Sequence, residues 1–581
     1  MFERQRNNDG SARTWLGLSR AQSGGGDERA ALESAGKVTL IAELLKSDDL
    51  AWRGTERTGE VLRKLGRLDD ARQAFERATA AIDRLAADAA VSTDARGQLS
   101  DSASAWAGLA FTFAQQGEGA AALRALEARR AHIRRAQFAA FHHDIARGAT
   151  AEELSDEQSI VREIISTRAQ LRADAQSPRR DPGRAEQLGR QLTALTAKRA
   201  EQQARLYARL PELPLWRGLP QPPIDPAALE SLVPGPRGLI VQYLVTDDEL
   251  LIVTVAHGEN GPDVAAQAAP IDRRAFAESL ASAMQPEVLQ SPSEWRKRAS
   301  ALAAALLEPI TARLADRDRI LIVPDDLLWK VPFEALPSGE ADLGSRASVT
   351  YATSLATLSL QRRAAPLPEH PVPGVLAAPL IPDAIRAQIL LTIPAWKTQD
   401  AEAARAAAQA AAATYGEGVT VRAGADASET AARALFGGSD VLHAQAPLQV
   451  SGATPLLSAV ILAATGEAPA DNGRFEVRDW FTLEGRARVV VLPDGSTFGA
   501  AGIGSAMDPI AWAAASAGVS TLIVGRWPAD AFTSDPLAAA FHAKLAAGMS
   551  SVDAWRAVTD EARQKNAAPA AWAGLRFIGG L

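Results

Sequence analysis

The chain has 581 residues, which is too long for one hydrophobic core and suggests roughly three or four units of ordinary domain size. Its net charge of -7 argues against a nucleic-acid partner, because proteins that neutralise phosphates usually carry a basic footprint. No stretch approaches the ~20 consecutive apolar residues of a membrane span, and residues 1–23 lack the apolar core of a signal peptide. We therefore expect a cytoplasmic protein that binds neither nucleic acid nor membrane.

The chain contains no cysteine. This composition excludes disulfides, thiolate metal sites and cysteine nucleophiles at once. Any catalytic nucleophile in this chain must therefore be a side chain of another type.

After a segment at residues 1–11 that we expect to be flexible, residues 12–135 carry the pattern of tetratricopeptide-like helical repeats. Small residues at fixed positions let two antiparallel helices approach, and large ones fill the gap to the next pair. The middle repeat has Gly59, Leu62, Gly66, Leu68, Ala71, Phe75 and Ala78 at the expected offsets. The last repeat has Trp106, Leu109, Phe113, Gly117, Ala122 and Leu126.

The first repeat matches the pattern weakly, because polar Gln22 occupies a position at which a large apolar residue belongs. The turn glycines lie farther apart than the standard period of about 34 residues. The helices are therefore longer than usual or carry insertions, and an irregular helical bundle without a superhelical groove is the alternative. The matching positions of this first repeat are Trp15, Leu18, Gly26 and Ala31.

Residues 136–210 are highly charged and are predicted to form a long helical hairpin that connects the repeats to the rest of the chain. Six prolines within residues 211–226 predict a linker, because no helix interior or central strand tolerates that density. We place the domain boundary in this proline-rich segment.

Residues 227–581 are predicted to form an α/β domain, so the fold class is a helical region followed by a mostly parallel sheet with helices. Residues 239–245 and 250–255 flank a short polar turn and predict a β-hairpin. Short apolar runs then alternate with helical stretches, which is typical of buried parallel strands. The expected strands lie at residues 320–323, 374–378, 419–423, 441–444, 489–492 and 521–524.

Five short segments follow one another in a recognisable order within this domain. They are residues 331–336 (VPFEAL), 351–354 (YATS), 426–430 (DASET), 525–530 (GRWPAD) and 572–579 (WAGLRFIG). Together they resemble the CHAT family, whose caspase-like peptidase domains often follow tetratricopeptide repeats. The resemblance covers roughly residues 226–581 and implies a caspase-like fold with a Cys-His dyad in active members.

The resemblance also implies where the dyad would lie. The histidine motif of the family matches residues 442–448 (LHAQAPL), with His443 at its first histidine and Pro447 at the position of the catalytic histidine. The cysteine motif matches residues 490–497 (VVLPDGST), with Gly495 at the position of the catalytic cysteine. Neither proline nor glycine can donate or accept the proton that this chemistry requires. We therefore predict a degenerate peptidase without catalytic residues, in which the Cα atoms of Pro447 and Gly495 lie within roughly 10 Å at the ends of neighbouring strands.

Other readings of the same region remain open. Ser496, with His443 or Asp494, could form a hydrolase site in the old crevice, although His443 is expected to be a buried mid-strand histidine. The run at residues 499–504 (GAAGIG) resembles a phosphate-binding loop but lacks the glycine order and the lysine of nucleotide motifs.

We expect no metal and no cofactor. Adjacent His142 and His143 point about 100° apart on a helix and cannot chelate one ion well. The other histidines, His132, His257, His370 and His542, form no spaced cluster with acidic residues, and Trp52, Trp106, Trp329, Trp527 and Trp572 are expected to be packing anchors.

These features predict an inactive CHAT-domain protein that acts as a scaffold or regulator, and its helical repeats are expected to bind a protein or peptide. A hydrolase that uses Ser496 is the alternative.

Overall fold

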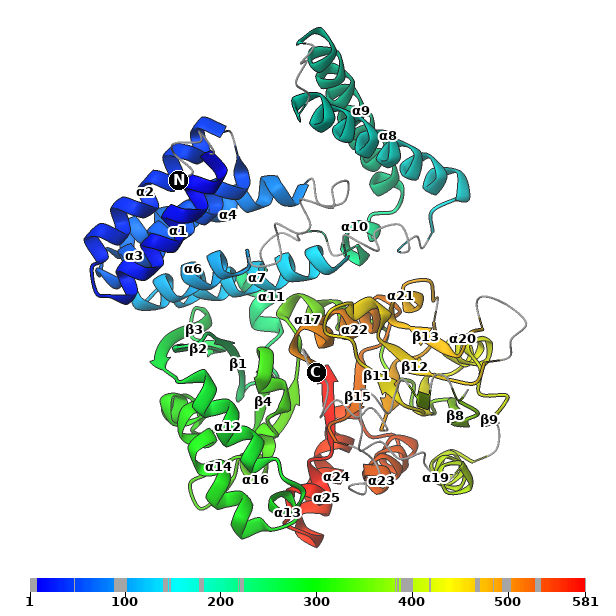
Figure 1. Cartoon of the computed structure of the whole chain (residues 1–581). Helices are drawn as coiled ribbons and strands as arrows, with labels where there is room; N and C mark the ends of the chain where they lie inside the picture. The colour runs from blue at the N-terminus through cyan, green and yellow to red at the C-terminus, as the bar shows by residue number, and fades with distance from the viewer. Residues whose placement is uncertain are drawn as a thin grey trace. The chain divides into compact units, whose positions relative to one another are not determined.

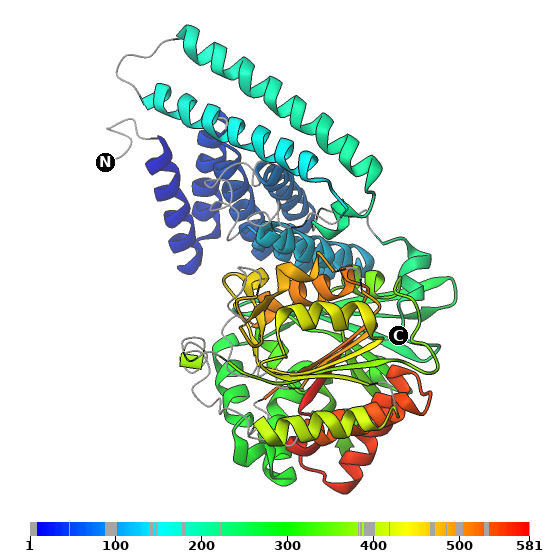
Figure 2. The ribbon, with the colours of Figure 1, turned by 90° about the vertical axis from the view of Figure 1, so that its right-hand side faces the viewer.

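The computed structural model describes residues 8–45, 47–87, 102–138, 145, 148–176, 182–217, 219, 224–381, 383, 386–387, 401–416, 419–464, 471–483, 485–493, 503–527 and 534–579. The chain divides into two compact units, Met1–Pro222 and Pro223–Leu581. Within the described residues, no helix is long and apolar enough to cross a membrane. Figures 1 and 2 show a helical first unit and a second unit built on one large sheet.

The first unit begins with three pairs of packed helices, α1 and α2, α3 and α4, and α6 and α7. Their turn glycines Gly26, Gly66 and Gly117 have φ values of 81°, 72° and 77°, a left-handed conformation that favours glycine. In each turn the amide after the glycine donates to a carbonyl five residues earlier, as Arg67 does to Leu62 at 2.9 Å. The predicted helical pairs are therefore confirmed. Their bounds are α1 Asn8–Gly24, α2 Glu28–Leu45, α3 Asp48–Lys64, α4 Leu68–Ala87, α6 Ser104–Gln115 and α7 Gly119–Phe138.

Phe75 explains the small residues of the repeat pattern. This fully buried side chain of α4 packs against Gly59 of its own pair and against Gly108 of the next pair. A Cβ atom at Gly108 would come within 2.3 Å of the Phe75 ring, closer than real Cβ contacts allow. Glycine therefore lets adjacent pairs approach around one large aromatic ring.

The weak first repeat is stabilised by polar contacts. Oε1 of Gln22 accepts a hydrogen bond from the hydroxyl of Ser34 at 2.7 Å across the α1–α2 pair. The buried guanidinium of Arg57 on α3 donates to the hydroxyl and the carbonyl of Ser19 on α1, at 2.9 and 3.0 Å. Hydrogen bonds thus replace the apolar contact that the pattern leads one to expect at Gln22.

The segment that follows contains the expected long helical hairpin, formed by α8 (Ala151–Gln176) and α9 (Pro182–Arg209). The proline-rich segment 211–226 includes the one-turn helix α10 (Leu213–Trp216) and the first residue of α11 (Pro226–Ser231). In both helices a proline occupies the first turn, where the backbone needs no N–H donor. Short helices therefore occur in this segment although its proline content predicts none.

The second unit is built on an 11-stranded sheet with the order β3-β2-β1-β4-β7-β16-β15-β14-β10-β8-β9. The sheet contains two groups of parallel strands. One group is formed by β1, β4, β7 and β16, and the other by β15, β14, β10, β8 and β9. The two groups meet where β15 pairs with β16 in antiparallel fashion. The mostly parallel sheet is therefore confirmed. The strands predicted from sequence correspond to β1 Gly238–Val245, β2 Glu249–Gly258, β4 Arg319–Val323, β8 Pro373–Pro379, β9 Thr420–Gly424, β10 Val441–Gln445, β14 Val489–Leu492 and β15 Thr521–Gly525.

Three strands of this sheet were not expected from sequence. The edge strand β3 (Gly261–Pro270) is rich in alanine, a weak strand former, and is held by pairing with β2 along its whole length. Strand β7 (Ser348–Tyr351) is short and ends at the first residue of the YATS segment, and the short strand β16 (Leu575–Gly579) lies within the segment 572–579. A small separate sheet contains β11 Leu448–Gln449, β12 Ala459–Ile461 and β13 Arg474–Glu476.

Helices cover both faces of the large sheet (Figure 2). Val441, Val491 and Ile523 of β10, β14 and β15 pack against Phe541 of α23 and Trp555 of α24. This apolar layer holds the central strands at fixed positions. The helices named below are α17 Leu355–Gln361, α19 Ala401–Ala413, α20 Glu429–Gly438, α22 Ile503–Ser516, α23 Ser534–Ala546 and α24 Ser551–Lys565.

The repeat register predicts the effect of a charge at the seam between α3 and α4. Ala71 is completely buried, so Ala71→Arg forces an unpaired guanidinium into a packed interface and is expected to reduce the free energy of unfolding by about 3 kcal/mol or more. Ala80 on the same helix is exposed, so Ala80→Arg is the matched control and is expected to change stability by at most about 0.5 kcal/mol. Urea unfolding followed by circular dichroism measures both, and equal stabilities of the two variants would contradict the register.

Candidate functional site

The segments that suggested a family meet around one buried ion pair. Arg526, from the segment 525–530, places Nη1 2.6 Å from Oε1 of Glu334, from the segment 331–336. The Arg526 guanidinium also donates to the hydroxyl oxygen of Tyr351 at 3.1 Å, and that hydroxyl donates to the second oxygen of Glu334. Three separate segments are therefore joined at a single charged centre.

The terminal segment 572–579 is attached to the same centre. Nη1 of Arg526 donates to the carbonyl of Ala573 at 2.8 Å, and the backbone amide of Arg526 donates to the carbonyl of Gly574 at 2.8 Å. Arg576 of β16 donates through Nη2 to the carbonyl of Trp329. The end of the chain is thus fixed to the loop that follows β4.

Burial decides the charge states at this centre. Arg526, Arg576 and Tyr351 are each at most 1% exposed. Burial lowers the pKa of Arg526, but the Glu334 carboxylate and the Tyr351 hydroxyl outweigh it and raise this pKa overall. For Arg576, burial and the nearby Arg526 together lower the pKa to about 9. Burial raises the pKa of Tyr351, which remains a neutral donor. Removing either partner of such a pair costs about 3–5 kcal/mol, because the other charge stays buried alone.

In two further family segments, a serine caps the N-terminus of a helix. Ser354, in the YATS segment, is the N-cap of α17 and accepts a hydrogen bond from the amide of Thr357 at 3.0 Å. Ser428, in the DASET segment, is the N-cap of α20 and accepts from the amide of Ala431 at 3.3 Å. Both serines satisfy backbone donors at helix starts, a structural role.

The strands that would carry a Cys-His dyad are neighbours, as predicted. Strand β10 pairs in parallel with β14, and His443 lies opposite Val491. Pro447, where the resemblance places the catalytic histidine, is buried and its carbonyl accepts a hydrogen bond from the amide of Ile461 at 2.8 Å. Asp494, Gly495 and Ser496 lie outside the described residues, so the separation of Pro447 and Gly495 stays a prediction.

His443 belongs to a buried chain of four polar side chains. Its Nε2 lies 3.1 Å from Oε1 of Gln445 and its Nδ1 lies 2.9 Å from Nε2 of His542 on α23. Nδ1 of His542 lies 2.9 Å from the hydroxyl of Tyr415, which follows α19. These side chains connect strand β10 to the helices that cover one face of the sheet.

The acceptor at Gln445 fixes the direction of every hydrogen bond in this chain. Because Oε1 of Gln445 can only accept, His443 carries its proton on Nε2 and accepts at Nδ1. His542 therefore donates from Nε2 and accepts the Tyr415 proton at Nδ1. Each ring nitrogen is used, which leaves His443 no free lone pair with which to activate a serine.

Both imidazoles are neutral. Burial lowers the pKa of His443 to about 4, and burial together with the neighbouring His443 lowers the pKa of His542 well below its usual value. The expectation of a satisfied core histidine at His443 agrees with this environment. The contributions of His542 and Tyr415 were missed, because residues so far apart in sequence give no common signal; only Gln445, two positions along the same strand face, could have been inferred from β-strand periodicity.

The remaining sequence candidates lie apart from this region or outside the described residues. His142, His143 and residues 499–502 are among the latter. Gly504, the last residue of the glycine-rich run, packs flush against the backbone of Asp326, where a Cβ atom would come within 2.6 Å of the Asp326 Cα. The absence of a Cβ atom at Gly504 therefore allows this close contact. All five tryptophans proposed as packing anchors are buried, namely Trp52, Trp106, Trp329, Trp527 and Trp572.

The second unit is an α/β domain with a mostly parallel sheet in which β10 and β14 are neighbours. Residues 296–580 match the model of the CHAT domain, and this part of the chain belongs to the CHAT domain family. No curated protein matches the chain. The predicted family resemblance is therefore confirmed for the C-terminal domain.

The buried histidines predict a pH-dependent stability. The folded pKa of His443, about 4, lies below the unfolded value of about 6.5, so the unfolded state binds more protons between these values. Acidification from about pH 6.5 to about pH 5 should therefore reduce the free energy of unfolding by on the order of 2 kcal/mol, with no contribution above about pH 6.5.

Urea unfolding at several pH values measures this dependence. The double variant His443→Leu/His542→Leu is expected to lose it, whereas His370→Gln, which removes an exposed histidine, should keep it. An unchanged pH dependence in the double variant would show that other groups cause it.

Proposed function

We propose that this chain is a catalytically inactive CHAT-domain protein whose helical repeats bind a protein or peptide partner. The observation that carries the proposal is the absence of cysteine from the 581-residue sequence, which leaves the caspase-like domain without the nucleophile of its family. Pro447, which cannot act as a base, stands at the motif position of the histidine.

The contacts of the family segments support this proposal. Glu334, Tyr351 and Arg526 use their polar atoms on one another, and Ser354 and Ser428 use theirs on helix caps. These residues stabilise the fold without any contribution from a catalytic dyad. A domain built in this way can keep its shape after the dyad is lost.

The first helices of the three pairs supply the surface expected to bind a partner. Helix α1 contacts α3, and α3 contacts α6, so that these helices lie next to one another. Exposed Arg20 and Lys64 lie beside the α1–α3 contact, and Nζ of Lys64 donates to the hydroxyl of Ser23 at 3.2 Å. Oε1 of Glu28 lies 3.9 Å from Nζ of Lys64. Burial and Glu60 raise the pKa of the neighbouring Glu56 to about 8.

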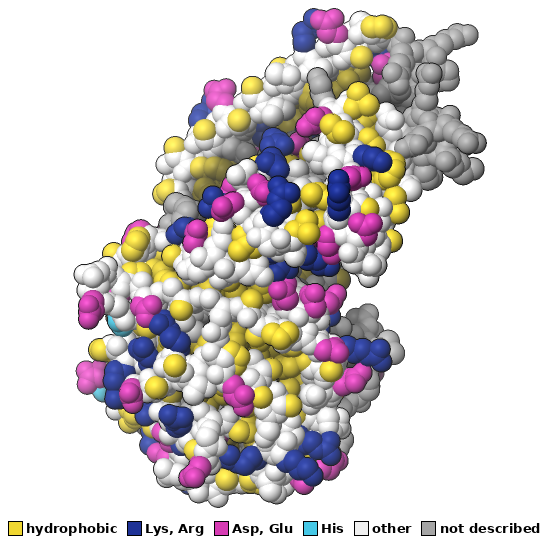
Figure 3. All heavy atoms as spheres, turned by 90° about the vertical axis from the view of Figure 1, so that its left-hand side faces the viewer, with side chains coloured by type: hydrophobic (Ala, Val, Ile, Leu, Met, Phe, Trp, Pro, Cys, Tyr) yellow, Lys and Arg dark blue, Asp and Glu magenta, His cyan; other side chains and the backbone are white. Residues whose placement is uncertain are grey.

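This arrangement favours an acidic segment of a partner protein. The exposed cations Arg20 and Lys64 attract negative side chains, and repeat surfaces commonly present many side chains to one bound peptide. Charges of both signs are mixed over the face of the molecule in Figure 3, which differs from the basic footprint typical of nucleic-acid binding.

The alternative is a hydrolase that uses Ser496. The hydrogen bonds of His443 argue against it, because both ring nitrogens are occupied and burial lowers the pKa of this histidine to about 4. Such an imidazole is a weak base that is sealed within the sheet.

Affinity capture with the full chain tests the binding role. The parent protein is expected to retain a partner, and Arg20→Glu with Lys64→Glu should release it, because the substitutions reverse both cations at the α1–α3 surface. Arg190→Glu with Arg205→Glu is the matched control, since both arginines lie exposed on α9. Recovery of the same proteins by all three forms would contradict binding through the repeats.

A further inference from the structure

Strand β3 leaves one edge of the large sheet open. Among the described residues it pairs with β2 alone, and no other backbone-to-backbone hydrogen bond involves residues 261–270. Helix α11 packs beside β3 at its beginning, where Glu230 lies 3.2 Å from His257, the residue opposite Pro262. An edge strand with unpaired backbone groups is a template for pairing with a further strand.

The phase of the β2–β3 ladder identifies the backbone groups that face outward. The amide of Ile271 donates to the carbonyl of Asp248 at 3.0 Å, and these two residues continue the register as direct partners. Directly opposed residues of an antiparallel pair alternate between bonded and non-bonded pairs. The odd-numbered residues of β3 therefore bond to β2, and the even-numbered residues direct their backbone groups away from it. These outward residues are Pro262, Val264, Ala266, Ala268 and Pro270.

The outward positions carry a short and symmetric set of donors. The amides of Val264, Ala266 and Ala268 have no hydrogen-bond partner among the described residues, and proline has no N–H group at all. The three donors are thus centred on Ala266, with Pro262 and Pro270 as boundaries at equal distances. Proline is tolerated at these two positions because the missing N–H would face away from β2.

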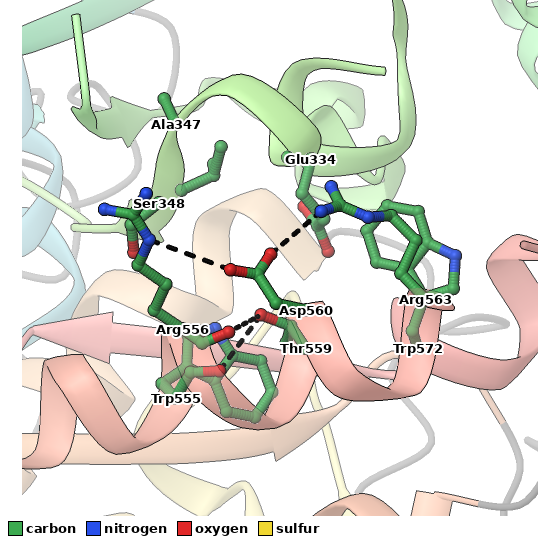
Figure 4. A pocket seen from close by; sticks show the side chains of 11 residues that line it. Glu334, Ala347, Ser348, Trp555, Arg556, Thr559, Asp560, Arg563 and Trp572 are labelled. Atoms are coloured by element: carbon green, nitrogen blue, oxygen red, sulfur yellow. Dashed lines mark hydrogen bonds and ion pairs between the residues drawn. The ribbon is translucent and has the colours of Figure 1, made fainter. Parts of the chain in front are cut away.

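The middle of this edge lacks the usual protection against pairing. Natural edge strands are commonly protected by charged side chains or by bulges. Other exposed elements of this unit carry such charges, as on α24, where Asp560 pairs with Arg556 and Arg563 (Figure 4). On β3 the sole charged residue is Asp263, which is bonded to Arg313, and the register with β2 is regular along the whole strand.

We propose that two copies of this chain associate through their β3 strands, which pair in antiparallel fashion about a two-fold axis at Ala266 and join the two sheets. In this register Val264 lies opposite Ala268 of the second copy, and Ala266 lies opposite its own equivalent. Every outward N–H group of both strands then gains a carbonyl acceptor, and proline faces proline at both ends. Two-fold dimers are the commonest form of soluble oligomer.

The side chains of β3 favour a second copy over an unrelated peptide. Alanine forms no ion pair or hydrogen bond, so the alanine-rich strand selects no particular peptide sequence, whereas its own copy places small residues opposite small residues. Asp263 lies opposite Ala269 of the second copy, so no two carboxylates come together. A basic peptide gains little from Asp263, because Arg313 already neutralises it. This association is independent of partner binding by the repeats.

Single cysteines test the register, because the chain has no cysteine of its own. Ala266→Cys sets two thiols opposite one another with Cα atoms about 5.5 Å apart, which is within the range of a disulfide. The full-length variant is expected to form a covalent dimer on oxidation with copper phenanthroline, as read by non-reducing electrophoresis. Ala268→Cys is the matched control on the same edge, since its two equivalents lie about 14 Å apart and should not cross-link.

Sedimentation equilibrium of the full-length chain measures the association itself. The parent is expected to show a monomer–dimer equilibrium, and Ala266→Lys should weaken dimerisation roughly tenfold or more, because it places two like charges opposite each other. Ala281→Lys adds the same charge at an exposed position of α12 (Arg273–Ala283) and should leave dimerisation unchanged. Circular dichroism checks that both variants are folded.

Three results would overturn the proposal. They are a parent chain that stays monomeric at every concentration, an Ala266→Lys variant that dimerises as tightly as the parent, and cross-linking of Ala268→Cys as readily as Ala266→Cys. Protection of the β3 amides from hydrogen exchange by an added peptide, in a chain that stays monomeric, would identify a foreign strand as the occupant and would equally reject a second copy.

Discussion

The buried ion pair between Glu334 and Arg526 is the interaction on which the second unit depends most. One carboxylate and one guanidinium, both buried, connect the segment after β4 to the end of β15. Tyr351 at the end of β7 and the carbonyl of Ala573 before β16 complete the contacts. Each of these partners satisfies a group that would otherwise be buried without compensation, so the loss of any one would destabilise all of them.

If the domain is catalytically inactive, as we propose, this centre holds the fold without help from catalytic residues. The residues of the family segments hold strands together and cap helices. Pro447 is itself part of the structure, because its carbonyl bonds to Ile461 in the small sheet. His443, which keeps the first histidine of the motif, is committed to His542 and Gln445 in the core.

The elements best predicted from sequence are those whose own residues determine their conformation. Gly26, Gly66 and Gly117 require left-handed backbone and mark the helical turns, and the apolar runs of β10, β14 and β15 form strands because both faces of the sheet are buried. Strand β3 was missed because pairing with β2, and not its alanine-rich composition, makes it a strand.

The polar networks could not be predicted, because they unite residues distant in the chain. Glu334 and Arg526 are separated by nearly two hundred residues, and Tyr415, His443 and His542 come from three different elements. The motif resemblance located several of these residues but suggested no contact between them.

The central claim is that the CHAT domain of this chain retains its fold and has no hydrolytic nucleophile. The most direct measurement treats the full-length chain with a fluorophosphonate probe and, separately, with a diverse peptide library, and reads labelling and cleavage by mass spectrometry. The account predicts neither labelling nor cleavage, because the chain has no cysteine and both nitrogens of His443 are occupied. Labelling or cleavage that disappears in Ser496→Ala would contradict it and establish an active hydrolase.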